Sequence, residues 1–465
     1  MTTTPAPTTA PAAPPAASAS ASSASSTSST TLLRFATAGS VDDGKSTLVG
    51  RLLHDSKSVL ADQLEAVEHA SRSRGHSAPD LALLTDGLRA EREQGITIDV
   101  AYRYFATPAR RFILADTPGH VQYTRNMVTG ASTAHLTVIL VDARHGVVEQ
   151  TRRHAAVAAL LRVPHVVLAV NKMDLIDHDE AAFTAIAAEF TGYAASLGVP
   201  EVTAIPISAL NGDNVVVRSA TMDWYTGPTV LEHLEGVEVG HDPTEEPARF
   251  PVQYVIRPQS AELPDYRGYA GQIAAGVLRV GQSVTVLPSG RTTTIEGIDL
   301  LGEPVDVAWA PQSVTVRLTD DLDVSRGDLI AADSVTESIR EITATVCHLH
   351  DRPLTPGARV LLKHTTRTVK AIVADIPSRL SLSDLSQEPN PGELVANDIG
   401  RVTVRTAEPL AVDAYADSRR TGSFLLIDPA DGSTLTAAMA GEAFTAARGA
   451  GESSPTAPDD EGWDF

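Results

Sequence analysis

One eight-residue stretch, Gly39-Ser-Val-Asp-Asp-Gly-Lys-Ser46, constrains this chain more than any other. It has the spacing of a phosphate-binding loop: a glycine, four residues, then Gly-Lys-Ser. An apolar run that reads as a strand, Leu32–Ala38, precedes it, and a leucine pattern typical of a helix, Lys45–Asp55, follows. Such a strand, turn and helix N-terminus present backbone N–H groups to phosphate. The alternative, a glycine-rich turn that carries a lysine by chance, is disfavoured because the chain has only five lysines.

Each residue type in this loop has a chemical reason to be there. The two glycines let the backbone fold around a β-phosphate, and Lys45 supplies positive charge for the β and γ oxygens. The Ser46 hydroxyl can ligate Mg²⁺. The predicted phosphate-binding residues are Gly39, Ser40, Val41, Asp42, Asp43, Gly44, Lys45, Ser46 and Thr47.

Strand-like and helix-like segments alternate from Leu32 to about Glu238, which predicts an α/β domain with a mostly parallel sheet and helices on both faces. Ligands of such sheets bind at the carboxyl ends of the strands. The predicted strands are Leu32–Ala38, Arg111–Ala115, Leu136–Asp142, His165–Asn171 and Thr203–Ile207. The predicted helices are Val121–Ser132, Gln150–Arg162 and Ala181–Leu197.

Two further motifs follow the ends of predicted strands. In Asp116-Thr117-Pro118-Gly119-His120, the aspartate can hold Mg²⁺ through a water and the Gly119 N–H can meet a γ-phosphate. His120 would then face the attacking water. Alone, the motif would be better explained as a turn capped by Asp116, but it follows a phosphate loop in the expected order.

The motif Asn171-Lys172-Met173-Asp174 predicts recognition of guanine. A carboxylate here can accept two hydrogen bonds from the N1–H and N2–H₂ edge of guanine, an edge that adenine lacks. Ser208-Ala209-Leu210, after the last predicted strand, can offer backbone N–H groups to the guanine O6. Taken in series, these motifs predict a site for GTP and Mg²⁺.

The long polar segment from Ser56 to Ile98 is interpreted as a loop that senses the γ-phosphate. Thr97, in Gly95-Ile-Thr-Ile98, is predicted to be a Mg²⁺ ligand together with Ser46 and Asp116. Within the same segment, Asp62–Arg74 is better explained as a charged, solvated helix.

Length and charge restrict the possible classes of protein. At 465 residues the chain is expected to form two to four domains. A net charge of −21 argues against a broad nucleic-acid-binding surface, and no apolar run is long enough for a membrane span. Cys347 is the single cysteine, which favours a reducing cytoplasm.

The five motifs together resemble those of translation-factor GTPases. Two longer runs, Ala90–Tyr102 and Asp116–Ala131, closely resemble the large, GTP-hydrolysing subunit of heterodimeric bacterial sulfate adenylyltransferase, as do Asn211–Val215 and Trp224–Glu232. The resemblance covers about Leu33 to Ala443.

This resemblance implies that GTP hydrolysis drives the formation of adenylylsulfate and pyrophosphate from ATP and sulfate. A small ATP-using catalytic subunit would carry the adenylyl transfer as the heterodimeric partner. The resemblance also implies that His120 orients the attacking water, with Lys45 and Thr97 as the other catalytic residues. The competing interpretations are an elongation-factor-like GTPase that binds aminoacyl-tRNA and a nucleotide-gated scaffold without turnover.

Short β-rich runs with Gly and Pro between them replace the α/β pattern after about Glu246, and they predict two small β-barrels that meet near Thr336–Arg340. The predicted strands are Phe250–Arg257, Gly271–Val277, Ser283–Leu287, Arg291–Ile298, Val314–Leu318, Ile342–Leu349, Arg359–His364, Thr366–Asp375, Glu393–Val404 and Gly422–Ile427. The expected domains are an Ala/Ser/Thr/Pro leader (1–31), a GTP-binding domain (32–245), two barrels (246–337 and 338–445) and an acidic tail (446–465).

Two groups of side chains in the second half of the chain could form a metal site or a binding site, but a structural role is preferred for both. His348, His350 and His364 are expected to be partly exposed strand residues rather than metal ligands. Arg419 and Arg420 could meet a nucleotide or a partner, but a surface turn is the preferred interpretation.

Overall fold

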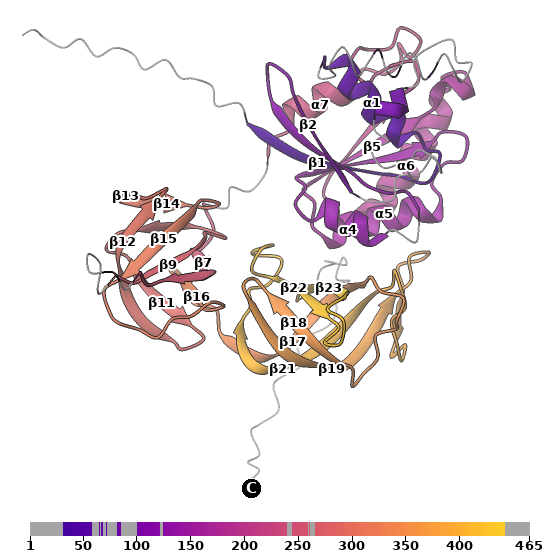
Figure 1. The fold of residues 1–465 in the computed structure, drawn as a ribbon. Helices are drawn as coiled ribbons and strands as arrows, with labels where there is room; N and C mark the ends of the chain where they lie inside the picture. The colour runs from indigo at the N-terminus through magenta and orange to yellow at the C-terminus, as the bar shows by residue number, and fades with distance from the viewer. Residues whose placement is uncertain are drawn as a thin grey trace, which may run out of the picture.

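The computed structural model describes residues 31–57, 65, 67, 71, 81–84, 100–120, 124–239, 244–258, 260 and 266–441. An α/β domain is followed by two β domains, and in Figure 1 the α/β domain lies above the C-terminal β domain. In the described segments, no helix combines the length and the apolar character needed to cross a lipid bilayer.

Six strands form the sheet of the first domain, in the order β2-β3-β1-β4-β5-β6. Neighbouring strands are parallel except β2, which runs antiparallel to β3. The carboxyl ends of β1, β3, β4 and β5 therefore meet at one edge of the sheet. The strands are β1 (Leu32–Ala38), β2 (Ala101–Ala106), β3 (Arg111–Asp116), β4 (Leu136–Asp142), β5 (His165–Asn171) and β6 (Val202–Pro206).

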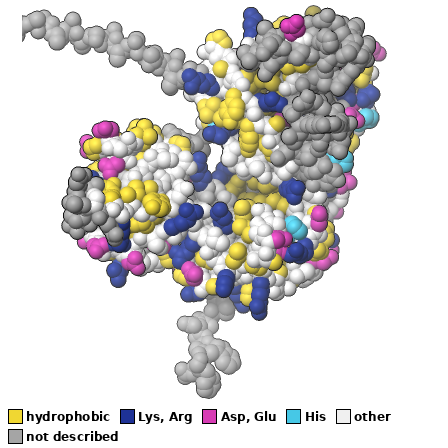
Figure 2. Space-filling model, viewed as in Figure 1, with side chains coloured by type: hydrophobic (Ala, Val, Ile, Leu, Met, Phe, Trp, Pro, Cys, Tyr) yellow, Lys and Arg dark blue, Asp and Glu magenta, His cyan; other side chains and the backbone are white. Residues whose placement is uncertain are grey.

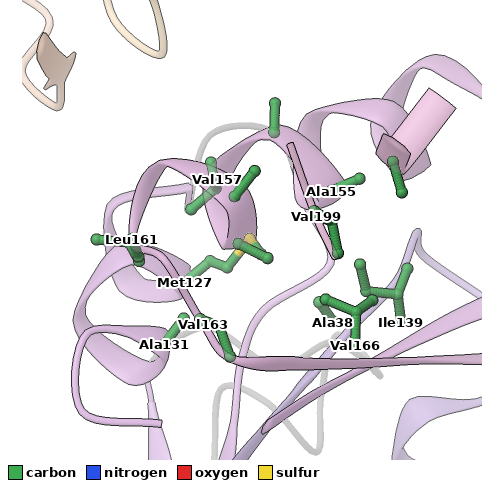
Figure 3. Close-up of a cluster of buried hydrophobic side chains, with 14 of the residues drawn as sticks. Ala38, Met127, Ala131, Ile139, Ala155, Val157, Leu161, Val163, Val166 and Val199 are labelled. Carbon is green, nitrogen blue, oxygen red and sulfur yellow. The ribbon is translucent and has the colours of Figure 1, made fainter. Parts of the chain in front are cut away.

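Helices cover both faces of this sheet because its strands alternate buried residues between two cores. In β5, Val167 and Ala169 join the core that includes α1 and α7, whereas Val166 and Leu168 join the core of α4, α5 and α6. Figure 3 shows Met127 of α4 and Val157 of α5 in the second of these cores. The helices are α1 (Lys45–Asp55), η1 (Leu81–Leu84), α4 (Thr124–Ala131), α5 (Glu149–Leu160), η3 (Met173–Ile176), α6 (Glu180–Ser196) and α7 (Val230–Gly236).

The middle domain is built from antiparallel strands. An eight-stranded sheet runs β7-β16-β11-β12-β15-β9-β8, with β13 paired to β12, and β10 pairs with β14. The strands are β7 (Arg249–Pro251), β8 (Tyr254–Ile256), β9 (Gly268–Gln272), β10 (Val277–Arg279), β11 (Ser283–Leu287), β12 (Arg291–Leu300), β13 (Glu303–Val305), β14 (Val307–Trp309), β15 (Ser313–Leu318) and β16 (Leu329–Ala331).

The C-terminal domain is a closed antiparallel barrel. Its strands follow the order β18-β22-β23-β17-β21-β19, and pairing of β19 with β18 closes the ring. The short β20 pairs with β19. The strands are β17 (Ser338–His348), β18 (Arg359–His364), β19 (Arg367–Leu380), β20 (Gln387–Pro389), β21 (Ile399–Ala411), β22 (Ser423–Ile427) and β23 (Thr434–Ala440).

The first domain and the C-terminal barrel share a continuous apolar core. Tyr415 and Met439 of the barrel belong to the same buried cluster as α4 and α5. Arg419 donates hydrogen bonds to the carbonyl groups of Ser132 (2.8 Å) and Ala134 (3.2 Å) of the first domain. The preferred interpretation of Arg419 and Arg420 as turn residues agrees with the structure, but the half-buried Arg419 guanidinium group also joins two domains.

The predicted α/β domain followed by two β domains is confirmed, with several differences in the elements. Helix α7 and strands β2, β13, β14, β16, β20 and β23 were not predicted. The predicted strand Phe250–Arg257 is divided into β7 and β8, and Gly271–Val277 falls at the end of β9 and the start of β10. His348 and His364 are buried rather than partly exposed. Each of their rings contacts backbone or hydroxyl oxygens, since His348 lies against Thr436 and the Arg352 carbonyl and His364 against the Thr421 carbonyl.

Candidate nucleotide site

The phosphate-binding loop connects the carboxyl end of β1 to the first turn of α1. Gly44 precedes the helix in the left-handed region (φ 93°), and a Cβ at this position would lie 2.4 Å from the amide nitrogen of Asn171. No side chain caps the helix, and its first turn contains no acidic residue. The N–H groups of this turn therefore remain available to an anion.

Lys45 is buried beneath this loop. Its ammonium group donates to the carbonyl oxygens of Gly39 (2.8 Å) and Ser40 (2.7 Å). Burial lowers the pKa of Lys45, and the negative charge of Asp116 opposes that shift. The Ser40 hydroxyl oxygen is also buried, and it has no hydrogen-bond partner among the described residues. The loop thus holds the Lys45 ammonium group and the unpaired Ser40 hydroxyl group, and a phosphate oxygen bound here could accept a hydrogen bond from each.

The Asp116–His120 loop packs directly against the phosphate-binding loop. Asp116 is 2% exposed and accepts a hydrogen bond from the Thr37 hydroxyl (2.9 Å) at the end of β1. A Cβ on Gly119 would lie 2.3 Å from the Lys45 ammonium nitrogen and 2.6 Å from the Gly39 carbonyl oxygen. Only glycine allows this approach. His120 follows as an exposed residue at the edge of the site.

Asn171 joins three of the predicted motifs. It is 2% exposed, and its amide nitrogen donates to the Asp43 carbonyl (2.7 Å) in the phosphate-binding loop. Its amide oxygen accepts from the backbone N–H of Ala209 (2.9 Å) in the Ser208–Leu210 segment. The sequence predicted this residue as part of the guanine-recognition motif, and the structure also places its side chain against the phosphate-binding loop.

The remaining base-pocket residues lie at the ends of β5 and β6. Asp174 is half-buried in the first turn of η3, and Lys172 precedes that turn in the left-handed region (φ 63°). Ser208 is buried, whereas Leu210 is 68% exposed. These residues lie on the same edge of the sheet as the phosphate-binding loop, as expected for strands that end together.

Asp142 is a site residue that the motif analysis missed. It ends β4, is 3% exposed, and accepts from the Lys172 ammonium group (2.9 Å). Arg144 contacts both of its carboxylate oxygens, at 3.0 and 2.7 Å. Burial alone would raise the pKa of Asp142, but the hydrogen bonds from Arg144 and Lys172 hold it well below its usual value. A carboxylate at the end of the buried run Leu136–Asp142 was the available sequence signal.

One predicted ligand cannot be placed. Thr97 and its surrounding segment 85–99 lie outside the described residues. The other predicted site residues from Gly39 to Leu210 are described and lie at one edge of the sheet.

Comparison with known proteins agrees with this geometry. The family model for the elongation factor Tu GTP binding domain matches residues 30–242, and that for the GTP-eEF1A C-terminal domain-like family matches residues 341–440. A solved structure of sup35 complexed with GMPPNP matches with a TM-score of 0.40 at 22% identity, covering 88% of this chain and 94% of that chain.

Similarity to curated proteins is much higher. The bifunctional enzyme CysN/CysC of Mycobacterium tuberculosis is 58% identical over 411 residues, which cover 88% of this chain and 67% of that protein. Sulfate adenylyltransferase subunit 1 of Cellvibrio japonicus is 48% identical, with 89% of this chain and 88% of that protein covered. The corresponding subunit of Bacteroides fragilis is also 48% identical, with coverages of 88% and 85%. At this identity and coverage, the chain belongs to the GTP-binding family of sulfate adenylyltransferase subunit 1.

Proposed function

We propose that this chain hydrolyses GTP to drive the synthesis of adenylylsulfate and pyrophosphate from ATP and sulfate by a separate, smaller ATP-using subunit. The observation that supports this most directly is the set of nucleotide motifs at one edge of the sheet, in a chain 46–58% identical to the curated relatives. Those relatives are named as sulfate adenylyltransferase subunit 1 or as the bifunctional enzyme CysN/CysC. The proposed compartment is the cytoplasm.

The loop residues 39–47 bind the phosphates, with Lys45 at the β and γ oxygens. The Lys45 ammonium group donates to the carbonyl oxygens of Gly39 and Ser40 in the structure. When GTP binds, phosphate oxygens take the place of these two carbonyl oxygens as its hydrogen-bond acceptors. Asp174 accepts from the guanine edge, and the Ala209 and Leu210 backbone N–H groups face its O6.

Mg²⁺ fits the oxygen donors at this edge. The Ser46 hydroxyl, the buried Asp116 carboxylate and Thr97 are the proposed ligand set, and hydroxyl and carboxylate oxygens are the donors that Mg²⁺ prefers. When bound, the ion neutralises phosphate charge. The Thr37 hydroxyl holds one oxygen of Asp116, which fixes the orientation of the carboxylate.

His120 orients the attacking water. It follows Gly119, whose position is fixed against Lys45, while the imidazole itself is exposed. An exposed ring can turn toward the phosphates in one state of the complex and away in another. Turnover is thereby coupled to the state of the partner subunit.

The proposed function is tested by reconstitution. The purified chain is mixed with the candidate small subunit, ATP and sulfate, and pyrophosphate release is measured with and without GTP. We expect GTP to increase pyrophosphate release, and Lys45→Ala to remove that increase while the control Lys370→Ala on β19 keeps it. If GTP has no effect with any candidate subunit, and the chain instead copurifies with aminoacyl-tRNA, the elongation-factor interpretation replaces the proposed one.

A further inference from the structure

A second cavity lies between the first domain and the C-terminal barrel. Its volume is about 780 Å³, and none of its described lining residues belongs to the nucleotide site. Arg125 and Thr129 of α4 contribute to one wall, and Lys363 of β18 and Leu425 of β22 contribute to the other. Small-molecule pockets typically have volumes of about 300–1,000 Å³, so this cavity has room for a compound of nucleotide size.

The charge of this cavity is opposite to that of the chain. Its lining includes Arg125, His350, Lys363, Arg419 and Arg420, and within the described residues it includes no aspartate or glutamate. The chain as a whole carries a net charge of −21. Figure 2 shows Lys and Arg side chains around the hollow where the domains meet. Positive charge is therefore concentrated here without the carboxylates that are abundant elsewhere.

The four Arg and Lys side chains that line the cavity differ in their contacts with the rest of the protein. Arg419 is held by the carbonyl groups of Ser132 and Ala134, and Arg420 donates to Gln272 (3.1 Å). By contrast, Arg125 and Lys363 are exposed and make no ion pair with any residue in the described ranges. They come from different domains, so one ligand between them would contact both.

Positive charges beside the cavity also act on one another. Burial, together with the positive charges of Arg419 and Arg34, lowers the pKa of His135, beside this interface, to about 4. Several cations held at one interface repel each other, and an anion bound among them reduces that repulsion. The geometry and the charge thus favour the same kind of ligand.

We propose that this cavity binds a small, multiply charged phosphate or sulfate compound, with Arg125 and Lys363 as its oxyanion contacts. The arginine fork matches phosphate and sulfate oxygens bidentately, whereas the lysine acts as a point charge. Leu425 and Ala437 supply apolar surface for the rest of the ligand. A bound anion links α4 to the barrel, so its occupancy stabilises this arrangement of the two domains.

Calorimetry on the full chain tests the site. Excess GDP and Mg²⁺ first occupy the nucleotide site, and inorganic pyrophosphate, AMP or sulfate is then titrated in separate arms. We expect one of the three to bind with a dissociation constant in the millimolar range or below, and the arm that responds identifies the recognised group. The double variant Arg125→Gln, Lys363→Gln should weaken that binding at least about tenfold, because it removes both free cations.

The matched control is Lys370→Gln, an exposed lysine on the neighbouring strand β19 that does not line the cavity. It should bind the anion as the unmodified chain does, and all variants should bind GDP equally. Absence of heat in all three arms, or equal affinity in the double variant, would overturn the site. The choice of probes rests on the proposed function, but the readout is binding to this chain alone, so a failure of sulfate activation would leave the result interpretable.

Discussion

Asp174 is the residue on which the preference for guanine depends. Asp174→Asn should weaken GTP binding by at least about 100-fold, because an amide cannot accept both hydrogen bonds and each charged bond contributes about 1.5–3 kcal/mol. Xanthosine triphosphate, which offers a carbonyl in place of the amino group, should gain affinity. Competition binding with the two nucleotides measures the change. An unchanged preference for GTP over xanthosine triphosphate would show that another residue reads the base.

His120 should act on turnover rather than on binding. His120→Ala should leave GDP and GTP affinities within about threefold of the unmodified chain and reduce GTP hydrolysis at least about 100-fold, in the range that one positioned catalytic group contributes. Single-turnover phosphate release in the reconstituted complex measures the effect. A parallel loss of nucleotide affinity would instead indicate a structural role for the side chain.

Single residues were predictable where a motif defines them. Lys45 and Asp116 follow from spacing because phosphate chemistry requires those residue types at those positions. Asp142 did not, since its role depends on β4 lying next to β5, which brings the carboxylate to Lys172. The domain contact of Arg419 was not predicted for the same reason, because its partners Ser132 and Ala134 lie more than 280 positions away in sequence. Contacts between distant segments leave no local pattern.

At the scale of elements, Asn171 connects the ends of β5 and β6 to the start of α1. Asn171→Ala should destabilise the first domain by about 2–4 kcal/mol, because it leaves the Asp43 carbonyl and the Ala209 N–H buried without partners. The replacement Asn171→Asp keeps the acceptor for Ala209 but places a carboxylate against the Asp43 carbonyl, so it should not restore GTP binding. Urea unfolding and GTP affinity of both variants are the measurements. Full stability of Asn171→Ala would contradict the bracing role.

Helix α5 carries a histidine that should make the first domain sensitive to acid. His154 is 1% exposed, with its ring beside the Met127 sulfur and the Gln150 amide. Burial, and to a lesser degree the charge of Lys45, lowers its pKa to about 3, against 6.5 for an unperturbed histidine. Below pH 6.5 the unfolded chain therefore binds a proton that the folded chain excludes, and stability falls as the pH decreases toward 3.

The contribution of His154 can be isolated from other titrating groups by substitution. One such histidine contributes a slope of about 1.4 kcal/mol per pH unit between its two pKa values. The free energy of unfolding of His154→Gln should thus depend less steeply on pH by about that amount between pH 5.5 and 4, as measured by urea unfolding at each pH. Equal slopes for both proteins would mean that the ring is protonated in the folded state.

The elements that the sequence did not predict are those with weak local signals. β23 reads Thr-Leu-Thr-Ala-Ala-Met-Ala, and its alanines have low strand propensity. Its conformation is fixed by pairing with β17 and β22, which only the closed barrel provides. By contrast, β4 and β5 are continuous apolar runs buried on both faces, a pattern that indicates a central strand directly.

At the scale of the whole molecule, a buried ion pair joins the two β domains. Arg249 of β7 contacts both carboxylate oxygens of Asp413, which follows β21, at 3.0 and 3.1 Å. The hydroxyl groups of Thr336 and Thr421 donate to the same carboxylate. Burial alone would raise the pKa of Asp413, but these partners lower it. The contact is therefore complete at neutral pH and is lost only as the pH falls below the ordinary aspartate value of 3.8.

Replacing Arg249 alone should lower the free energy of unfolding more than replacing both charged residues of the pair. Arg249→Met leaves the Asp413 carboxylate buried without a counter-charge, and such changes typically cost about 3–5 kcal/mol. Adding Asp413→Asn removes the uncompensated charge while the new amide oxygen still accepts from one threonine, so the double variant should recover at least about half of the loss. Urea unfolding gives the energies, and small-angle X-ray scattering reports whether the two β domains separate. Equal destabilisation in the single and double variants would mean that the guanidinium hydrogen bonds to the Ala248 and Ser334 carbonyl groups within the middle domain, rather than the ion pair, account for the loss.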